Sequence, residues 1–255
     1  MSSILFTLKE AAYLWVRNFW YIALISLVID APIVGINTVV AAHLRPGSTP
    51  HPGSSLAWVS LALLLFIAIF SAIKMAAILG LLRRRLTGQG PAASILNSVA
   101  SSTGRLFLVE ILLCLLGLPI MLVGGFAMKL MGPLHIILKL TLALYFVFLG
   151  FALPEVFVVQ EGKGAWGAIV EAARVAWRHL VYVAVSYLIV VVGVYVVGKA
   201  LGHLPTVQMP WIGFAVQWAR GLVSTFLIVL FWCIYLHLKD QENPAAEGHL
   251  QPSAD

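Results

Sequence analysis

Six ionisable side chains interrupt the long apolar runs of this sequence, and these are the residues whose types could support chemistry. They comprise three acids and three bases, namely Asp30, Glu110, Glu155, Lys74, Lys139 and Arg220. A charged group inside a bilayer is costly and usually faces another helix or water. Matched acids and bases therefore indicate pairing within the protein, and a proton or cation path is the chemistry that such groups could support.

Asp30 is the first candidate among the six, because Pro32 follows it within one helical turn. A proline frees a backbone carbonyl in the preceding turn, so a polar pocket could form around the carboxylate. One interpretation places Asp30 at the centre of a relay, with Arg220 as its counter-ion. The other is a structural ion pair with Arg220 or Lys139, since buried ion pairs are often architectural.

The elements that must position these groups follow from composition. Hydrophobic residues make up 61% of the 255 residues and charged residues only 10%, and the mean hydropathy is +0.99. Such a chain is an all-α polytopic membrane protein rather than a soluble domain. A span needs about 20 apolar residues, and six runs qualify: 19–42, 56–82, 106–128, 134–160, 180–202 and 211–238. We expect residues 1–240 to form one transmembrane domain and residues 241–255 a disordered tail.

The distribution of Lys and Arg over the connections predicts the orientation. One side would hold Lys9, Arg17, Arg83, Arg84, Arg85, Arg105, Lys163, Arg174, Arg178 and Lys239, and the other only Arg45, Lys129 and Lys199. Basic loops stay in the cytoplasm, so both termini are expected there, in a bacterial inner membrane. Lys74, Glu110 and Glu155 would then lie toward the cytoplasmic side, Lys139 and Arg220 toward the outer side, and Asp30 near the middle.

Glu155 follows Pro154 at the expected cytoplasmic end of the fourth span. A carboxylate at a kinked span end could gate a cytoplasmic opening together with Lys74 and Glu110. Alternatively, Glu155 could tether the short helix that follows, by accepting a hydrogen bond or an ion pair from it.

Matched residues at constant spacing indicate an internal repeat. A shift of 161 places 10–12 (Glu-Ala-Ala) on 171–173 and Arg17 on Arg178. A shift of 74 places 88–90, a Gly-Gln-Gly turn, on 162–164, a Gly-Lys-Gly turn. The difference of 87 carries Pro32 onto Pro119, and 74 more leads to Gly193. We expect three parallel units, about 1–86, 87–160 and 161–240, each an interfacial amphipathic helix followed by two spans.

The membrane interface is expected at the short amphipathic helices. Residues 165–178 carry Trp166 and Trp177 on an apolar face, and Trp15 lies in the corresponding helix near the N-terminus. This is the pattern of a helix lying flat at the headgroups. The run Arg83, Arg84 and Arg85 is interpreted as an orientation signal and lipid anchor, and anionic lipids are the expected partners.

The layout of residues 153–180 carries a resemblance. A Pro-Glu span end, a Glu-Gly turn, an alanine-rich amphipathic helix and a new span follow one another there. This order resembles the bacterial families around the membrane domain of glycerophosphoryl diester phosphodiesterase and the YciC-like inner-membrane proteins. The resemblance implies the fold. It implies no catalytic residue, because the hydrolysis in the fused phosphodiesterases resembles the work of a separate soluble domain.

Several classes of function are not indicated. Cys114 and Cys233 lie inside apolar runs without metal-ligand spacing, so we expect no disulfide framework, metal or cofactor. The net charge of +6 is explained by a membrane surface rather than by nucleic acid. The catalytic motifs of hydrolases, zinc proteases and nucleotide-binding enzymes are missing, so we expect no enzyme.

Two functions stay open. The first is a non-catalytic module that organises lipids or binds partner proteins, or further copies of itself, through its amphipathic helices. The second is a small transporter or channel that uses the charged residues around Asp30.

Overall fold

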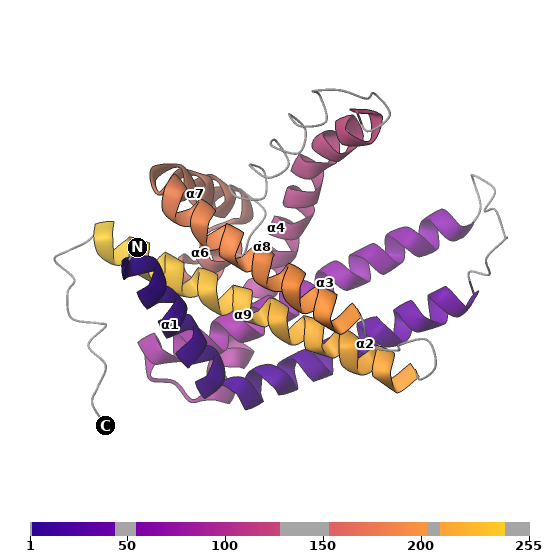
Figure 1. Cartoon of the computed structure of the whole chain (residues 1–255), viewed down its shortest axis with the longest axis horizontal. Coiled ribbons are helices and arrows are strands. Elements are labelled where there is room, and N and C mark those ends of the chain that lie inside the picture. Colours follow the sequence, from indigo (N-terminus) through magenta and orange to yellow (C-terminus); the bar gives the residue numbers. More distant parts are fainter. Residues whose placement is uncertain (1, 44–54, 128–152, 203–209, 243–255) are drawn as a thin grey trace.

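The computed structural model describes residues 2–43, 55–127, 153–202 and 210–242, and these residues form helices without any strand. The helices are α1 (Ser2–Arg17), α2 (Phe19–His43), α3 (Ser55–Thr87), α4 (Pro91–Ala127), α6 (Leu153–Glu161), α7 (Ala165–Arg178), α8 (Leu180–Gly202) and α9 (Pro210–Glu242). Figure 1 shows their arrangement. The all-helical class predicted from the sequence is confirmed.

Four of these helices are long and apolar enough to cross a membrane, within the part of the chain that the structure describes. The candidate spans are Phe19–Ile36, Ala62–Thr87, Pro91–Pro119 and Phe214–Gln241. The chain is therefore a helical protein with several membrane-spanning candidates. Most of the expected fourth span, 134–160, lies outside the described residues, as does the tail beyond Glu242. The expected fifth span coincides with α8.

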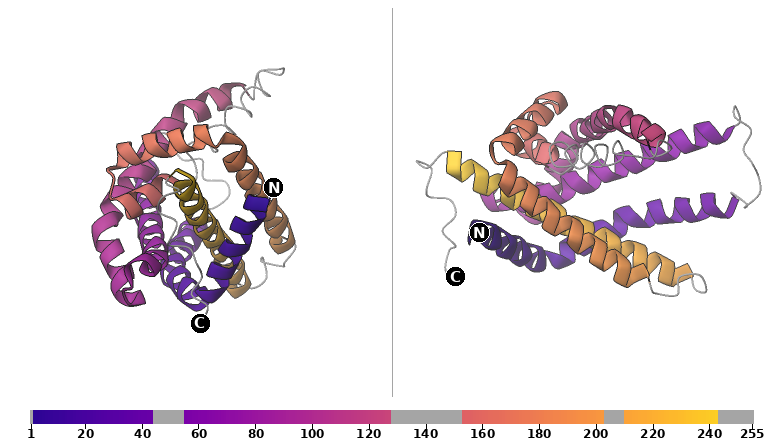
Figure 2. Two further views of the ribbon diagram at one scale, coloured as in Figure 1. Left: turned by 90° about the vertical axis from the view of Figure 1, so that its left-hand side faces the viewer. Right: turned by 45° about the horizontal axis from the view of Figure 1, so that its top comes forward.

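Helix α9 forms the centre of the molecule. It packs against α1, α2, α3, α6 and α8, and Figures 1 and 2 show it running between them. Its residues 228–235 are buried on all sides, with Phe231 and Trp232 among the largest fully buried side chains. A helix with apolar residues on every face is stable only where all of its faces are shielded from water, in a protein core or in lipid. The core therefore forms where the C-terminal half of α9 meets the other helices.

Two short helices each turn into a long helix at a single polar residue. The first break is at Asn18, between α1 and α2, and the second is at His179, between α7 and α8. At both, the backbone N–H still bonds the carbonyl four residues earlier, at 3.1 Å for Asn18 and 3.0 Å for His179. The two breaks are separated by the 161-residue shift that the sequence comparison found.

The two glycine turns also have the same backbone structure. Gly88 and Gly162 both adopt the left-handed conformation, with φ of 66° and 65°, which favours glycine because a Cβ would be strained there. Gly88 N–H bonds the Arg84 carbonyl, and Gly162 N–H bonds the Val158 carbonyl. These are helix C-termini of the type that glycine commonly ends.

The expectation of a separate interfacial helix in the second unit is wrong. Residues 91–105 continue without a break into the apolar part of α4. Arg105 occupies the position that corresponds to Asn18, and its guanidinium donates to the Ser101 carbonyl within the helix and to the Gly162 carbonyl outside it. This side chain therefore connects α4 to the α6–α7 turn while its own backbone stays helical.

Serines on α4 form its contact with α3. Ser94, Ser98 and Ser102 are buried and lie four residues apart, on one helical face. The Ser94 hydroxyl donates to the Gly80 carbonyl at 2.6 Å. A Cβ placed on Gly80 would lie 2.6 Å from the Ser98 Cβ, so the two helices touch at their backbones.

Candidate functional site

Asp30 forms an ion pair with Lys74 of the neighbouring helix. The Lys74 ammonium lies 2.9 Å from Oδ1 and 2.8 Å from Oδ2 of the Asp30 carboxylate. The Lys74 side chain is 11% exposed and that of Asp30 15%. Gly221 of α9 lies directly against the pair, because a Cβ there would overlap the carboxylate. Three helices, α2, α3 and α9, therefore meet at one buried pair of opposite charges.

The partner of Asp30 differs from the sequence interpretation, which named Arg220 or Lys139. Lys139 lies outside the described residues, and the side chain of Arg220 in α9 is likewise outside the description. The sequence interpretation did not name Lys74 because it placed the end of α3 too early. Helix α3 runs to Thr87, beyond the expected span end, so Lys74 lies about three and a half turns from that end and Asp30 about three turns from the break at Asn18. The two residues therefore have the same depth.

Glu155 lies in the core of α6. It is 7% exposed, and its Oε2 atom has no hydrogen-bond partner among the described residues. Glu110 of α4 lies close enough to Glu155 for the two carboxyl groups to interact electrostatically, and it accepts a hydrogen bond from the Ser71 side chain. Lys74, the third member of the expected gate, is instead held by Asp30. The structure therefore brings Glu110 toward Glu155, while Lys74 pairs with Asp30.

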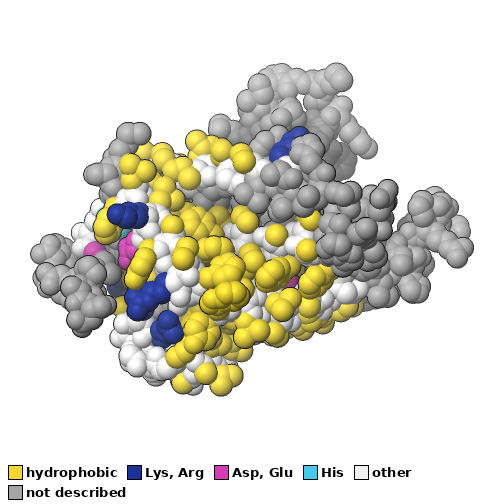
Figure 3. Space-filling view, turned by 60° about the horizontal axis from the view of Figure 1, so that its bottom comes forward, with side chains coloured by type: hydrophobic (Ala, Val, Ile, Leu, Met, Phe, Trp, Pro, Cys, Tyr) yellow, Lys and Arg dark blue, Asp and Glu magenta, His cyan; other side chains and the backbone are white. Residues whose placement is uncertain are grey.

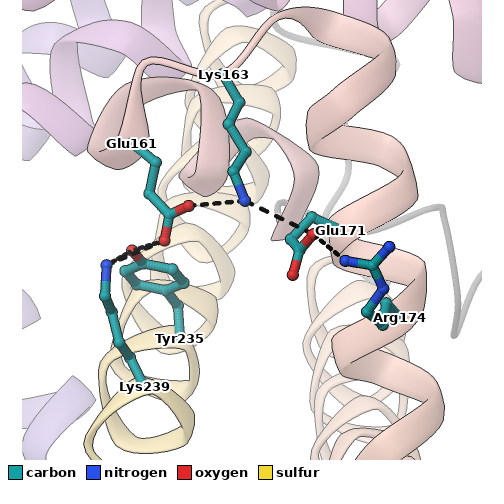
Figure 4. A network of polar contacts seen from close by, with 6 residues as sticks. All are labelled: Glu161, Lys163, Glu171, Arg174, Tyr235 and Lys239. Carbon is teal, nitrogen blue, oxygen red and sulfur yellow. Dashed lines mark hydrogen bonds and ion pairs between the residues drawn. The ribbon is translucent and has the colours of Figure 1, made fainter. Parts of the chain in front are cut away.

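The tether to α7 is made by Glu161, a residue that sequence reasoning missed. Figure 4 shows the network that it organises. Its carboxylate lies 2.9 Å from the Lys163 ammonium, 2.8 Å from the Tyr235 hydroxyl and 3.0 Å from the Lys239 ammonium. Lys163 also approaches Glu171 of α7 at 3.7 Å. The spacing of Tyr235 and Lys239, one helical turn apart, is the signal that could have indicated a shared acceptor.

Glu161 stays charged to low pH because of these donors. Burial would raise the pKa of its carboxyl group, but hydrogen bonds from Lys163, Tyr235 and Lys239 and the charge of Lys239 outweigh it and lower the pKa to about 2. The ordinary value is 4.5. The stabilisation that the ionised group provides is therefore complete above about pH 4.5 and is lost as the pH falls toward 2.

Replacement of Glu161 by Gln is expected to lower the free energy of unfolding by about 1 kcal/mol at neutral pH, as for a partly exposed ion-pair network. The difference from wild type should shrink between about pH 4.5 and 2, since the wild type loses the same charge there. Thermal unfolding in detergent at stepwise pH measures it. Asp240→Asn, at an exposed carboxylate on α9, is the control. A pH-independent difference would contradict the assignment.

The three consecutive arginines have separate structural partners. Arg83 donates to the Val159 carbonyl at 3.1 Å, which satisfies one of the free carbonyls at the end of α6. Arg84 donates to the Asn18 amide oxygen at 2.8 Å, at the break between α1 and α2. Arg85 lies over the ring of Tyr13. The run therefore connects helices, beyond the lipid-anchor role that its composition predicts.

The tryptophans of the expected interface fall into two groups. Trp166 is 59% exposed and Trp177 is 71% exposed on α7. Trp15 instead lies between helices, where its indole N–H donates to the Thr225 hydroxyl at 3.0 Å and its ring meets Phe226 edge-on. The exposed tryptophan near Trp15 is Trp20, which is 81% exposed.

Metal or thiol chemistry finds no support in the described ranges. No group of three or more metal-ligating side chains occurs there, and Cys114 and Cys233 are both free. The features that remain are a buried ion pair, a buried carboxyl group and an exposed aromatic face. Comparison with protein-family models, with curated proteins and with solved structures finds no match, so the functional argument for this chain rests on these features.

Proposed function

We propose that the chain is a non-catalytic integral membrane module of six spans in three parallel units. Its amphipathic helices lie at the cytoplasmic face of a bacterial inner membrane and bind lipids there. The observation that carries this proposal is the outward face of α7. Trp166, Val170 and Trp177 are exposed on it, while the opposite face packs against the protein.

The inward face of α7 accounts for its position. Ala168, Ala172 and Ala176 are completely buried and lie four residues apart, so the helix can approach its neighbours closely. An amphipathic helix normally turns its apolar residues inward and its polar residues outward. Large aromatic residues on the outward face are instead typical of a helix at the headgroup level, where indole rings accumulate.

Corresponding positions in the three units support the repeat. Ala11 and Ala172 are both fully buried, and so are Ile22 and Val183, to within 1%. Each pair is related by the 161-residue shift. The shift of 74 relates the buried serine face of α4 to the buried alanine face of α7. The serine-rich segment therefore preserves small, inward-facing residues, although its sequence match is the poorest.

The charge distribution supports the orientation. Figure 3 shows most of the visible Lys and Arg side chains at one end of the molecule, beside a broad hydrophobic surface, and one further basic side chain apart from them. The two glycine turns and the network around Glu161 belong to the same set of connections. By the preference of cytoplasmic loops for basic residues, this end would face the cytoplasm with both termini.

The double replacement of Trp166 and Trp177 by Ser tests the proposed seat of α7. Its backbone amides should exchange with solvent roughly tenfold faster in lipid nanodiscs, because the helix loses its two interfacial anchors and opens locally more often. Hydrogen exchange followed by mass spectrometry measures this. The α9 amides from Ile228 to Leu238, in the core, should not change.

The matched control replaces both tryptophans by Phe, which keeps the apolar rings and should largely preserve protection. Unchanged exchange of α7 in the serine variant would contradict lipid seating and would assign the exposed face to a protein partner, which purified nanodiscs lack. A second copy of the chain would be recognised by a change in oligomeric state of the serine variant.

A small transporter or channel is the second candidate, and the buried groups favour it. They are the Asp30–Lys74 pair and the Glu155 carboxyl oxygen without a described partner. Liposomes loaded with a pH-sensitive dye test this candidate under imposed ion gradients. Flux in the wild type that Asp30→Asn abolishes would support it. Silence of both proteins across the ions tested would leave the pair as a structural feature.

A further inference from the structure

Three arginines from two helices converge beside the break between α1 and α2. Arg17 and Arg85 each lie 6.0 Å from the centre of the Tyr13 ring, and Arg17 also donates to the Tyr13 hydroxyl at 3.3 Å. Arg84 lies over the ring of Tyr21 at 5.7 Å. We call Arg17, Arg84 and Arg85 the arginine cluster. Two of its members share one aromatic ring.

The arginine cluster brings like charges together with little compensation. Arg17 and Arg85 are close enough to repel one another, and Glu10 is the carboxylate whose charge reaches Arg85. Among the described residues none of the three guanidinium groups forms an ion pair. Their partners are instead two tyrosine rings and the Asn18 amide oxygen. Such an arrangement attracts an anion, and guanidinium groups bind the oxygens of a phosphate particularly well.

A hydrophobic strip begins next to the arginine cluster. On α2, Trp20 is 81% exposed, Leu24 59% and Val28 63%. These residues recur every four positions, so they form one outward face that runs from the cluster along the helix. The acyl chains of a lipid whose phosphate lies at the cluster could therefore extend along this apolar face of α2.

We propose that the arginine cluster and the outward face of α2 bind one anionic phospholipid. Its phosphate contacts Arg17 and Arg85, Arg84 supports the site from the break at Asn18, and its chains lie along Trp20 and Leu24. This inference rests on the proposed membrane function and names a lipid class and a site for it. An anionic headgroup is preferred to a zwitterionic one because it retains net negative charge to balance the arginines.

Titration with diacyl phosphatidylglycerol in detergent, followed by native mass spectrometry, tests the site. Phosphatidylcholine with the same chains is titrated in parallel. The wild type should retain phosphatidylglycerol at roughly 25-fold lower concentration than phosphatidylcholine, because two arginines contact its phosphate. Arg17→Gln combined with Arg85→Gln should remove this preference, since each basic residue near a membrane surface contributes roughly a fivefold gain in affinity for anionic lipid.

Arg174→Gln is the matched control, because it removes the same charge from a residue already paired with Glu171 at 2.7 Å. It should leave the preference intact. Thermal unfolding checks the fold of each variant. If the double Gln variant is unstable, Arg17→Lys with Arg85→Lys keeps the charges and should still weaken phosphatidylglycerol retention severalfold, because Lys cannot bind phosphate with two parallel hydrogen bonds.

If the folded double Gln variant retains phosphatidylglycerol as well as the wild type does, the assignment is overturned. An equal loss of the preference in Arg174→Gln would also overturn it, because the lipid would then respond only to the overall positive charge at this end of the protein. Displacement of the lipid by millimolar inorganic phosphate would identify a soluble phosphate as the ligand instead. Detergent micelles contain no bilayer for α7 to lie in. If the titration shows no phosphatidylglycerol preference but the α7 amides exchange faster in the serine variant as expected, the lipid site alone is overturned. If the preference is found but α7 exchange does not change, the proposed seating of α7 alone is overturned.

Discussion

Replacement of Lys74 by Met is expected to lower the free energy of unfolding by about 3–5 kcal/mol. Methionine has nearly the length of lysine, so packing against α2 changes little. The loss comes from Asp30, whose carboxylate accepts from Lys74 at both oxygens and would be left charged and unpaired between apolar helices.

Unfolding of the purified protein in detergent, followed by circular dichroism with increasing denaturing detergent, measures this loss. The control is the double variant Asp30→Leu with Lys74→Met, which removes both charges and should regain most of the stability. The difference between the double variant and the sum of the single variants gives the coupling of the pair. If the single effects simply add, the two side chains do not stabilise one another and the pairing is wrong.

The double variant also separates architecture from transport. It lacks the charges of the pair while retaining a folded bundle, so loss of ion flux in it cannot come from unfolding. Preserved stability without any flux in wild type would assign the pair to helix packing. Gly221 favours that role, since its missing side chain allows α9 to lie directly on the carboxylate.

The fold class could be predicted from the sequence because it depends on local quantities. Apolar run length predicted four helices that the structure contains as candidate spans. The spacing of 74 between two glycine turns predicted matching local structure, and Gly88 and Gly162 have nearly the same φ. A turn of this kind depends on a residue that tolerates positive φ, so its position can be read from the sequence.

The contents of the candidate site depended on long-range geometry, and prediction was poorer there. Trp15 and Trp177 look alike in an amphipathic pattern, but only the neighbouring α9 decides that Trp15 faces Thr225. The partner of Asp30 required the end of α3 to be known to within one turn. Helix ends are the least certain feature of a sequence interpretation, and an error of one turn changes which charges meet.

The burial of the serine face of α4 depends on long-range geometry in the same way. Ser94, Ser98 and Ser102 are polar, so the sequence pattern of residues 91–105 alone does not indicate that they are buried. Ser94 and Ser98 lie directly against Gly80 of α3, which indicates that small residue size is the requirement of this contact. Polarity could vary because a buried hydroxyl can bond a carbonyl of the facing helix, as Ser94 does.

Replacement of Gly80 by Ala is therefore expected to lower the free energy of unfolding by about 1–3 kcal/mol. The added Cβ would lie 2.6 Å from the Ser98 Cβ and 2.9 Å from the Ser94 backbone carbonyl oxygen. The Ser98 hydroxyl could rotate away, but the Ser98 Cβ and the Ser94 carbonyl are fixed by the α4 backbone, so the two helices must separate. That separation would also lengthen the 2.6 Å hydrogen bond from Ser94.

Gly104→Ala in α4 is the matched control, because a Cβ there meets nothing within 4 Å. It should be neutral or stabilise by up to about 1 kcal/mol, as alanine favours the helix over glycine. Both variants are compared by the same unfolding measurement. A combined Gly80→Ala and Ser98→Gly variant should recover part of the loss by removing one of the two overlaps. Equal stability of Gly80→Ala and wild type would mean that α3 and α4 do not touch at their backbones, and the small-residue explanation of the serine face would then be wrong.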